Sequence, residues 1–377
     1  MSGLSIIIPT HGRADLLERL LESVAADTAK VEFAVEMLLV DDTPEPANRQ
    51  LEDIARRHGA RVLKGESHVG GKRNLGAREA RYEFVLFLDS DVEIQPGLLR
   101  AHHDALSAAA PKVAGCLGKV EFVGEPTFSW RVIAEMQLTL PFAYPDVAEA
   151  VPWGPTANIS FRKTAFFTVG GFDTTLPLYG GEDVDLGLRL TREGYVIVTS
   201  RTAVAHHAIQ TWSTWRQNLE RLYRFGQADF HLLLRHPERS FLDFPTGPIL
   251  WLLQLVAGIV LMAVRGWELW PAVLVALLLS VLAYHVGYAM FKKQRRSSFW
   301  VHLAGPFIFY TMDLAKIIEA IRYARPGLIL RRVKFLDDLI AQDWREVAAS
   351  TWGLAASAFA YGTATVFLVC MELGVQQ

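Results

Sequence analysis

Cysteine is scarce in this chain of 377 residues, which contains only Cys116 and Cys370. Two cysteines so far apart exclude a disulfide framework and a cysteine-rich zinc site. Neither sign of charge dominates, because the formal net charge is −2 at pH 7. A chain so close to neutrality gives no general argument for a nucleic-acid partner, and we expect none.

Two common phosphate-binding fingerprints are missing. The first predicted turn lacks G-x-G-x-x-G, and the chain lacks G-x-x-x-x-G-K-[ST]. These absences disfavour a dinucleotide-dependent dehydrogenase and a P-loop ATPase. The N-terminus has no charged segment followed by an apolar one, and residues 5–9 have the pattern of a short buried strand instead. We therefore expect no secretory signal and a first domain that stays in the cytosol.

Charged residues are almost absent from three stretches near the C-terminus, residues 248–264, 269–291 and 348–371. About 20 apolar residues cross a bilayer, whereas a helix of a globular core is seldom apolar on every face. Basic clusters follow residues 291 and 320, and the positive-inside rule places both in the cytosol. Residues 299–318 are apolar but include charges, and a crossing there would export the second cluster, so we expect an interfacial or re-entrant segment. The chain is thus predicted to be a multi-pass protein of a plasma or inner membrane.

The first 210 residues alternate strand-like and helix-like segments. Strand-like patterns cover residues 4–9, 36–40, 61–64 and 82–88, and helix-like patterns cover residues 14–25, 46–58, 72–80 and 184–193. This alternation predicts an α/β fold with a parallel sheet covered on both faces. Ligands bind such sheets at the carboxyl ends of the strands, so the residues there are the candidates for a site.

Two carboxylates follow the strand-like segment at residues 82–88, in the tripeptide Asp89-Ser90-Asp91. Carboxylate oxygens suit Mg²⁺ or Mn²⁺, which complete their coordination with substrate phosphates and water. A bound ion there would neutralise the charge that develops on a diphosphate leaving group. For the tripeptide alone, a solvated loop before the next helix is the alternative interpretation.

Other polar residues at the same edge suit a nucleotide. Asp41 and Asp42 follow the second strand, where a carboxylate commonly accepts hydrogen bonds from a ribose, although a plain turn is the alternative. Residues 70–74 open a helix, so backbone N–H groups, Lys72 and Arg73 can face phosphate oxygens together. Exposed charges at a helix end are the alternative interpretation of those two side chains.

The order and spacing of these motifs resemble the family 2 glycosyltransferases, which have the GT-A fold. The resemblance covers about residues 4–235 and is carried by residues 5–10, 40–43, 72–76 and 87–91. It implies that Asp89 and Asp91 hold Mn²⁺ or Mg²⁺. It also implies a donor pocket that includes Pro9, Thr10, Arg13, Asp41, Asp42, Lys72, Arg73, Asp89 and Ser90.

Residues 153–158, 170–173 and 180–183 extend the resemblance. In family members the last acidic pair supplies the catalytic base, which implies Asp183, with Glu182 beside it. A carboxylate suits inverting transfer, which needs a base opposite the leaving group, but an acidic pair can also simply complement a helix N-terminus. In several related enzymes a histidine near this point completes the metal shell. His206 is therefore the candidate and His207 the next, with a surface pair as the alternative.

Aromatic and basic residues alternate in the helix-like segment 212–235, just before the first apolar stretch. This composition suits a bilayer interface and anionic lipid, although a helix packed on the domain can show the same pattern. The Q-x-x-R-W motif of processive cellulose, chitin and hyaluronan synthases is absent, because residues 217–222 have different spacing and no tryptophan. Together with the small number of membrane helices, this favours transfer of a single sugar.

We therefore predict a GT-A domain over residues 1–210, an interfacial helix region over residues 211–245 and a membrane region over residues 246–377. The predicted enzyme is an inverting glycosyltransferase that moves a sugar from a UDP- or GDP-sugar to a membrane lipid or lipid-linked acceptor, such as a polyprenyl phosphate. A processive polysaccharide synthase, a nucleotidyltransferase and a non-catalytic membrane scaffold are the alternatives.

Overall fold

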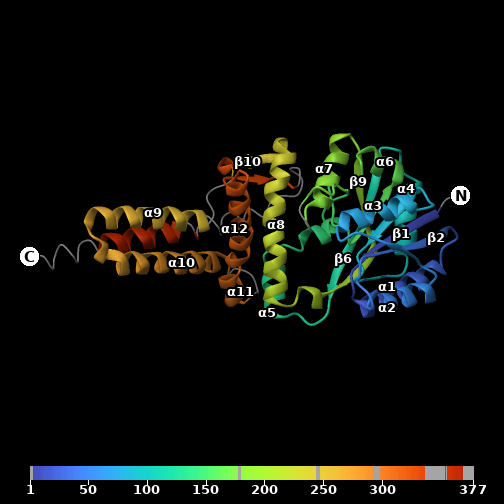
Figure 1. Ribbon diagram of the computed structural model, residues 1–377, viewed down its shortest axis with the longest axis horizontal. Coiled ribbons are helices and arrows are strands. Elements are labelled where there is room, and N and C mark those ends of the chain that lie inside the picture. Colours follow the sequence, from blue (N-terminus) through green and yellow to red (C-terminus); the bar gives the residue numbers. More distant parts are fainter. Residues whose placement is uncertain are drawn as a thin grey trace, which may run out of the picture.

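An α/β domain and a helical region lie at opposite ends of the molecule (Figure 1). The computed structural model describes residues 3–176, 180–242, 247–292, 298–335, 353 and 355–367. The long helices α8 (Trp215–Arg235) and α12 (Pro306–Arg322) stand between the α/β domain and the apolar helices α9 (Gly247–Arg265) and α10 (Trp270–Lys292). The predicted order of an α/β domain followed by a helical region is thus confirmed.

The main sheet is mixed rather than parallel throughout. Its strands are β1 (Gly3–Thr10), β2 (Ala34–Asp41), β3 (Arg61–Lys64), β4 (Phe84–Leu88), β5 (Val92–Ile94), β6 (Val113–Val123), β7 (Ala150–Val151), β8 (Asn158–Arg162) and β9 (Val196–Ala208). They follow the order β3-β2-β1-β4-β8-β6-β9-β5, with β7 paired to β9. The strands β1 to β4 are parallel as predicted, whereas β8 runs antiparallel to both β4 and β6.

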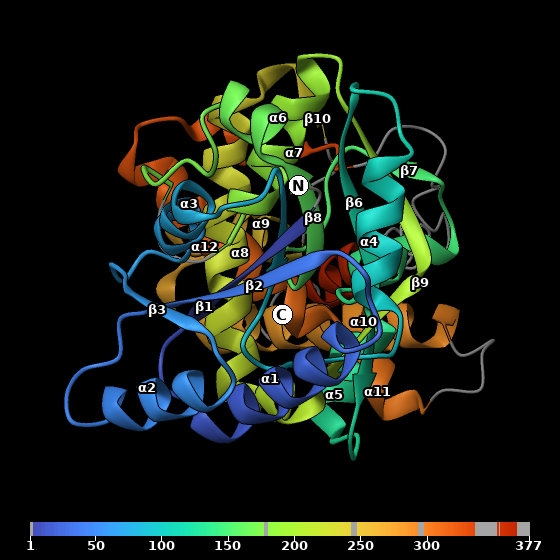
Figure 2. The same cartoon turned by 90° about the vertical axis from the view of Figure 1, so that its right-hand side faces the viewer.

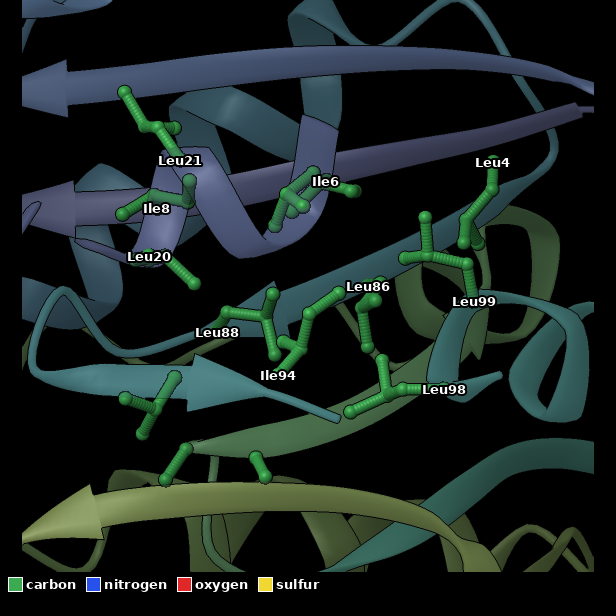
Figure 3. Packing of buried hydrophobic residues seen from close by; sticks show 14 of the residues in the cluster. Leu4, Ile6, Ile8, Leu20, Leu21, Leu86, Leu88, Ile94, Leu98 and Leu99 are labelled. Atoms are coloured by element: carbon green, nitrogen blue, oxygen red, sulfur yellow. The ribbon is translucent and has the colours of Figure 1, made fainter. Parts of the chain in front are cut away.

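Helices cover both faces of the sheet, because successive side chains of a strand point to opposite faces. The helices of this domain are α1 (Ala14–Thr28), α2 (Asn48–Arg57), α3 (Val69–Glu79), α4 (Leu98–Ser107), α5 (Phe128–Glu135), α6 (Lys163–Thr168) and α7 (Glu182–Arg192). Leu4, Ile6 and Ile8 of β1 pack toward α1, α2 and α4 in one core cluster (Figure 3), whereas Ile7 packs toward α3, α6 and α7 in another. Figure 2 shows α1 and α3 on opposite sides of β1 and β2.

The rest of the chain is mainly helical. Its elements are α8 (Trp215–Arg235), β10 (Ser240–Leu242), α9 (Gly247–Arg265), α10 (Trp270–Lys292), α11 (Phe299–Ala304), α12 (Pro306–Arg322) and β11 (Arg331–Val333). Short 3-10 helices cover Leu140–Asp146, Ile209–Trp212, Pro237–Arg239, Trp267–Leu269 and Pro326–Leu328. Within the described residues, three helical stretches are long and apolar enough to cross a membrane: Gly247–Arg265, Trp267–Met290 and Phe299–Arg322.

Protein contacts bury parts of both the last predicted crossing and the predicted interfacial region. The predicted crossing at residues 348–371 lies partly outside the described residues, but residues 355–367 are helical. There the Ser357 hydroxyl lies 2.6 Å from that of Ser280 on α10. In the predicted interfacial region, Trp212 and Phe230 are buried by protein, whereas Trp215 is 36% exposed. Contact of that region with a bilayer stays a prediction.

Candidate active site

The carboxyl ends of β1 and β2 are joined through the carboxylate of Asp41. Parallel pairing sets Thr10 opposite Asp41, and the Thr10 hydroxyl donates to Asp41 Oδ1 over 2.8 Å. The Thr43 hydroxyl donates to the same oxygen over 2.6 Å and accepts from the Gly12 backbone N–H. Hydrogen bonds therefore connect the two strand ends. Asp41, at their junction, accepts from two hydroxyl groups and is only 7% exposed.

Lys72 and Arg73 at the start of α3 are almost completely buried, at 3% and 4% exposure. Lys72 Nζ donates to the Thr10 carbonyl over 2.6 Å and to Asp42 Oδ1 over 2.5 Å. A buried cation is stable only when charges and hydrogen bonds compensate for lost hydration. Lys72 thus ties the helix α3 to the ends of β1 and β2, and the Asp42 carboxylate balances its charge.

Arg73 joins the two acidic motifs. Its Nη2 donates to Asp89 Oδ1 over 2.8 Å, and its Nη1 donates to Glu182 Oε1 over 3.0 Å. Glu182 also accepts from the Gly180 backbone N–H, and Gly181 precedes α7 with φ 85°, a conformation that favours glycine. The guanidinium therefore brings the carboxylates at residues 89 and 182 to the same centre, although they lie far apart in the sequence.

Three metal-binding groups meet at the end of β4. Ligand atoms of Asp89, Asp91 and His207 all lie within 4.8 Å of one another. His207 is 4% exposed, and its Nε2 lies 3.5 Å from Asp91 Oδ1. The His207 ring packs 5.0 Å from the ring of Phe122, which fixes its orientation. Two carboxylates and an imidazole form a donor set that suits Mn²⁺ well.

The geometry moves the histidine candidate from His206 to His207. Neighbouring side chains on β9 point to opposite faces, so only one of the two can face Asp91. His206 Nδ1 lies 3.1 Å from Gln95 Nε2, and its Nε2 lies 3.6 Å from Glu121 Oε2. The structure thus does not bring His206 to the two aspartates, and the sequence alone did not show the phase of this strand.

The remaining predicted residues lie around the same centre. Arg13 is exposed in a left-handed backbone conformation (φ 61°), and its Nη1 donates to Asp91 Oδ2 over 2.7 Å. Pro9 and Ser90 are buried next to the strand ends. The predicted site residues therefore form one group, with the exception of His206.

Asp183 stands on the first turn of α7 beside Glu182. Its Oδ1 accepts from the Val184 backbone N–H over 2.8 Å. Burial, followed by the negative charge of Glu182, raises the pKa of Asp183 to about 7. A carboxylate with such a pKa is a base poised to accept a proton near neutral pH.

Sequence reasoning missed the role of Asn74, which closes the site from the side of α3. Its Nδ2 donates to the Phe172 carbonyl over 2.7 Å, and its Oδ1 accepts from the Phe172 N–H over 2.8 Å. This pairing locks the loop at residues 170–173 against α3, next to Arg73. Both segments are visible as motifs in the sequence, but their contact is a property of the fold.

We expect His207→Ala to weaken Mn²⁺ binding by at least about tenfold, because it removes one of three converging donors. The matched variant His206→Ala should leave Mn²⁺ affinity within about twofold, since His206 faces Gln95 and Glu121. Electron paramagnetic resonance of free Mn²⁺ during titration measures both affinities. Equal weakening in the two variants would contradict the assignment of His207.

Comparison with protein families covers most of the α/β domain. Residues 5–171 match the family model described as glycosyl transferase family 2. Residues 153–209 match the model described as the N-terminal domain of galactosyltransferase. The two matches together extend from β1 to β9 and include the residues described above.

Several curated proteins are similar to the same region. Validoxylamine A glucosyltransferase of Streptomyces hygroscopicus subsp. jinggangensis is 31% identical over 52% of this chain and 53% of its own length. The pre-mycofactocin glycosyltransferase of Mycobacterium tuberculosis is 27% identical over 63% of this chain and 49% of its own length. The O-antigen biosynthesis protein RfbC of Myxococcus xanthus is 29% identical over 54% of this chain and 17% of its own length. The chain thus spans about half or less of the length of these relatives.

A solved structure is similar over more of the chain. The mannosyltransferase PcManGT from Pyrobaculum calidifontis, in complex with GDP-Man and Mn²⁺, covers 95% of this chain and 86% of its own. The sequence identity is 17% and the TM-score is 0.46. The family models rather than this likeness carry the assignment: residues 5–171 of this chain are a glycosyltransferase family 2 domain.

Proposed function

We propose that this protein is an inverting, metal-dependent glycosyltransferase that transfers one sugar from a UDP- or GDP-sugar to a membrane lipid or lipid-linked acceptor. The observation that carries the proposal is the pair of bonds from Arg73 to Asp89 and Glu182. These bonds join a donor set for a metal to the carboxylate pair of Glu182, which is buried, and Asp183, which is half-buried, at the edge of the sheet where ligands bind. Two relatives, a glucosyltransferase and a glycosyltransferase, support the same reaction class.

The residues at the end of β4 fit a divalent cation. Asp89, Asp91 and His207 would hold Mn²⁺ or Mg²⁺, and the bound ion would neutralise charge on the diphosphate leaving group. Arg13 is bonded to Asp91 in this structure and is exposed, so its guanidinium is also available to a phosphate oxygen. Lys72 bonds to both the Thr10 carbonyl and Asp42, and so orders the strand ends that would line the donor pocket.

In the proposed reaction, the acceptor hydroxyl oxygen attacks the anomeric carbon of the donor sugar. A new carbon–oxygen bond forms as the bond to the diphosphate breaks, and the nucleoside diphosphate leaves with the electron pair. The proton of the acceptor hydroxyl passes to Asp183, whose raised pKa suits this role. Attack opposite the leaving group inverts the anomeric configuration. Glu182 is held beside Asp183 by its bond from Arg73.

The proposed acceptor follows from the apolar helices. The helix α9 spans 19 residues, and a helix of that length is about 28 Å long, which matches a hydrocarbon core of about 30 Å. At the turn between α9 and α10, Trp267 and Trp270 are 63% and 61% exposed, as expected at a membrane–water interface. A catalytic domain at the other end of α9 and α10 would meet acceptors held in the bilayer. The basic clusters after residues 291 and 320 favour the cytosolic side for that domain.

Product analysis distinguishes this proposal from its rivals. Purified protein would be incubated with UDP- and GDP-sugars, membrane lipid extract and Mn²⁺ or Mg²⁺. A glycosyltransferase releases nucleoside diphosphate, whereas a nucleotidyltransferase releases pyrophosphate, and a scaffold releases neither. Metal-dependent release of nucleoside diphosphate from one donor is the expected result. Pyrophosphate as the product, or no product with any donor, would overturn the proposal.

The pH dependence of kcat/KM should report the protonation of Asp183. Activity requires the ionised carboxylate, so kcat/KM should fall as pH decreases below about 7, the raised pKa of Asp183. This fall at low pH is the acid limb of the pH profile. Because the charge of Glu182 helps to raise the pKa of Asp183, Glu182→Gln should move the acid limb to lower pH. Glu193→Gln, at the exposed C-cap of α7, is the matched control and should leave the limb in place. An acid limb that does not move in Glu182→Gln would contradict the role of Asp183.

A further inference from the structure

The helix α12 has two chemically different faces. Four exposed apolar side chains lie on one of them, Phe307, Leu314, Ile318 and Ile321, with exposures of 53%, 52%, 40% and 68%. Their spacing of seven, four and three positions places them in a single stripe along the helix. Trp300 on α11 extends the exposed apolar surface at one end, with 66% exposure. We call these five side chains the α12 stripe.

The opposite face of α12 is charged and completely occupied by protein. Asp313, Lys316 and Glu319 are each 2–3% exposed. Lys316 Nζ lies 3.3 Å from Asp229 Oδ2 on α8, and Gln227 Nε2 of α8 donates to Glu319 Oε1 over 3.0 Å. Removing one partner of such a buried pair is strongly destabilising. The charged face therefore holds α12 on α8.

The two helices approach unusually closely. A Cβ on Gly226 of α8 would lie 2.0 Å from the carbonyl oxygen of Met312 on α12, so only glycine fits this position. On the next element, Arg332 Nη2 donates to Asp313 Oδ1 over 3.0 Å. These contacts make α8, α12 and β11 one rigid layer. The α8 residue Arg235 pairs in turn with Asp173 of the α/β domain over 3.0 Å, so the orientation of the α12 stripe is fixed relative to the active site.

The helix α12 lies across the near ends of α9 and α10 rather than alongside them (Figure 1). The ring of Tyr310 on α12 packs 4.6 Å from that of Trp251, near the start of α9. The Tyr310 hydroxyl lies 3.2 Å from His285 Nε2 in the last part of α10. If α9 and α10 cross the bilayer, these contacts place α12 at the bilayer surface on the side of the catalytic domain.

We infer that α12 lies in the plane of the membrane, with the α12 stripe immersed at the boundary between headgroups and acyl chains, and that it does not cross. The exposed Arg322 and Arg325 directly follow the stripe, where they suit anionic headgroups. The occupant of this surface is therefore the bilayer, continuous with the lipid around α9 and α10. Length and mean hydropathy alone admit Phe299–Arg322 as a crossing, and the charged inner face and the position of α12 argue against it. The inference concerns membrane docking and does not depend on which sugar is transferred.

Spin labels on single cysteines test this inference by immersion depth. Phe307, Leu314 and Ile321 would be replaced one at a time in a Cys370→Ser background and reconstituted in nanodiscs. Cys116 can remain, because it is fully buried and burial raises the pKa of its thiol to about 12. An in-plane helix predicts the same shallow depth for all three labels. A crossing predicts depths that spread over about 21 Å, from 14 residues at 1.5 Å each.

Matched labels at Leu252, Val256 and Val264 on α9 provide the control, because these side chains are 53%, 51% and 74% exposed along the proposed crossing. Their depths should change steadily along the helix. A steady change along α12 as well would overturn the in-plane assignment. Protection of the α12 labels from lipid, together with short distances between labels on two copies, would overturn it in favour of a dimer contact.

Lipid composition tests the charged end of the surface. With anionic lipid in the nanodisc, the Ile321 label should lie deeper than in neutral lipid, and the double variant Arg322→Gln/Arg325→Gln should remove the difference. The Phe307 label at the other end of the helix should not respond. An Ile321 depth that is independent of lipid charge would contradict the assignment of anionic headgroups to this end.

Discussion

Asp183→Asn should lower kcat by about 10²–10⁴-fold when the acceptor is a hydroxyl. Asparagine keeps the size of the side chain and can still accept from the Val184 N–H, but it cannot take the acceptor proton. Donor and metal contacts lie on β1, β2, α3 and β4, so KM for the nucleotide sugar should change little. Steady-state kinetics with saturating metal measures both constants.

The control for this variant is Glu193→Gln at the C-cap of the same helix, which should retain full activity. The size of the Asp183→Asn effect also reports the acceptor class. A phosphate acceptor is already ionised near neutral pH and needs no base, so the loss would then be much smaller. Full activity of Asp183→Asn with a hydroxyl acceptor would contradict the proposed base.

Asp91→Asn should be the second damaging change, with a loss in kcat/KM of about 10²–10³-fold. Asp91 connects two parts of the proposed donor site, because it lies beside His207 and accepts from Arg13. The asparagine side chain is neutral, and its NH₂ group is a donor that repels a cation. The replacement would therefore weaken both the contact with the metal ion and the bond from Arg13. Activity at rising Mn²⁺ concentration should recover only partly, since the bond that orients Arg13 is also lost.

Asp104→Asn is the matched control for that variant. Asp104 lies on α4 with its side chain 63% exposed, and it contacts only His103 among the ion pairs of the described residues. Its replacement should leave metal affinity and activity unchanged. Equal activity of Asp91→Asn and Asp104→Asn would remove the metal role from the tripeptide at residues 89–91.

The sequence identified the strands whose ends carry the site, because apolar runs followed by Thr10, Asp41 and Asp89 have strong local signals. It could not show which of His206 and His207 faces Asp91. That choice depends on the pairing of β9 with β5 and β6, which sets the phase of the strand. A shift of one residue would have exchanged the two side chains.

Contacts between distant segments were also beyond the sequence. The bridge from Arg73 to Glu182 joins residues that are 109 positions apart. The strand β6 is hard to recognise because it contains Gly115 and Gly118, which lower strand propensity. A Cβ on Gly118 would lie 2.3 Å from Asn158 Nδ2, so packing against β8 requires this glycine.

The segment at residues 299–318 illustrates the same limit in the membrane region. Its charges argued against a simple crossing, but the sequence did not show what they contact. In the fold, Lys316 meets Asp229 of α8, and the apolar side chains gather on the other face of α12. The distinction between an in-plane helix and a crossing therefore comes from tertiary packing.

Transfer of labelled sugar into lipid tests the central claim most directly. Nanodisc-reconstituted protein would receive each labelled UDP- or GDP-sugar with membrane lipid extract, with Mn²⁺ or with a chelator, and the organic phase would be counted. We expect label from one donor to enter the lipid fraction only with metal, to be lost in Asp91→Asn and, with a hydroxyl acceptor, in Asp183→Asn, and to be retained in Asp104→Asn and Glu193→Gln. Metal-independent labelling, or equal labelling in all four variants, would contradict the proposal that these carboxylates act in one glycosyl transfer.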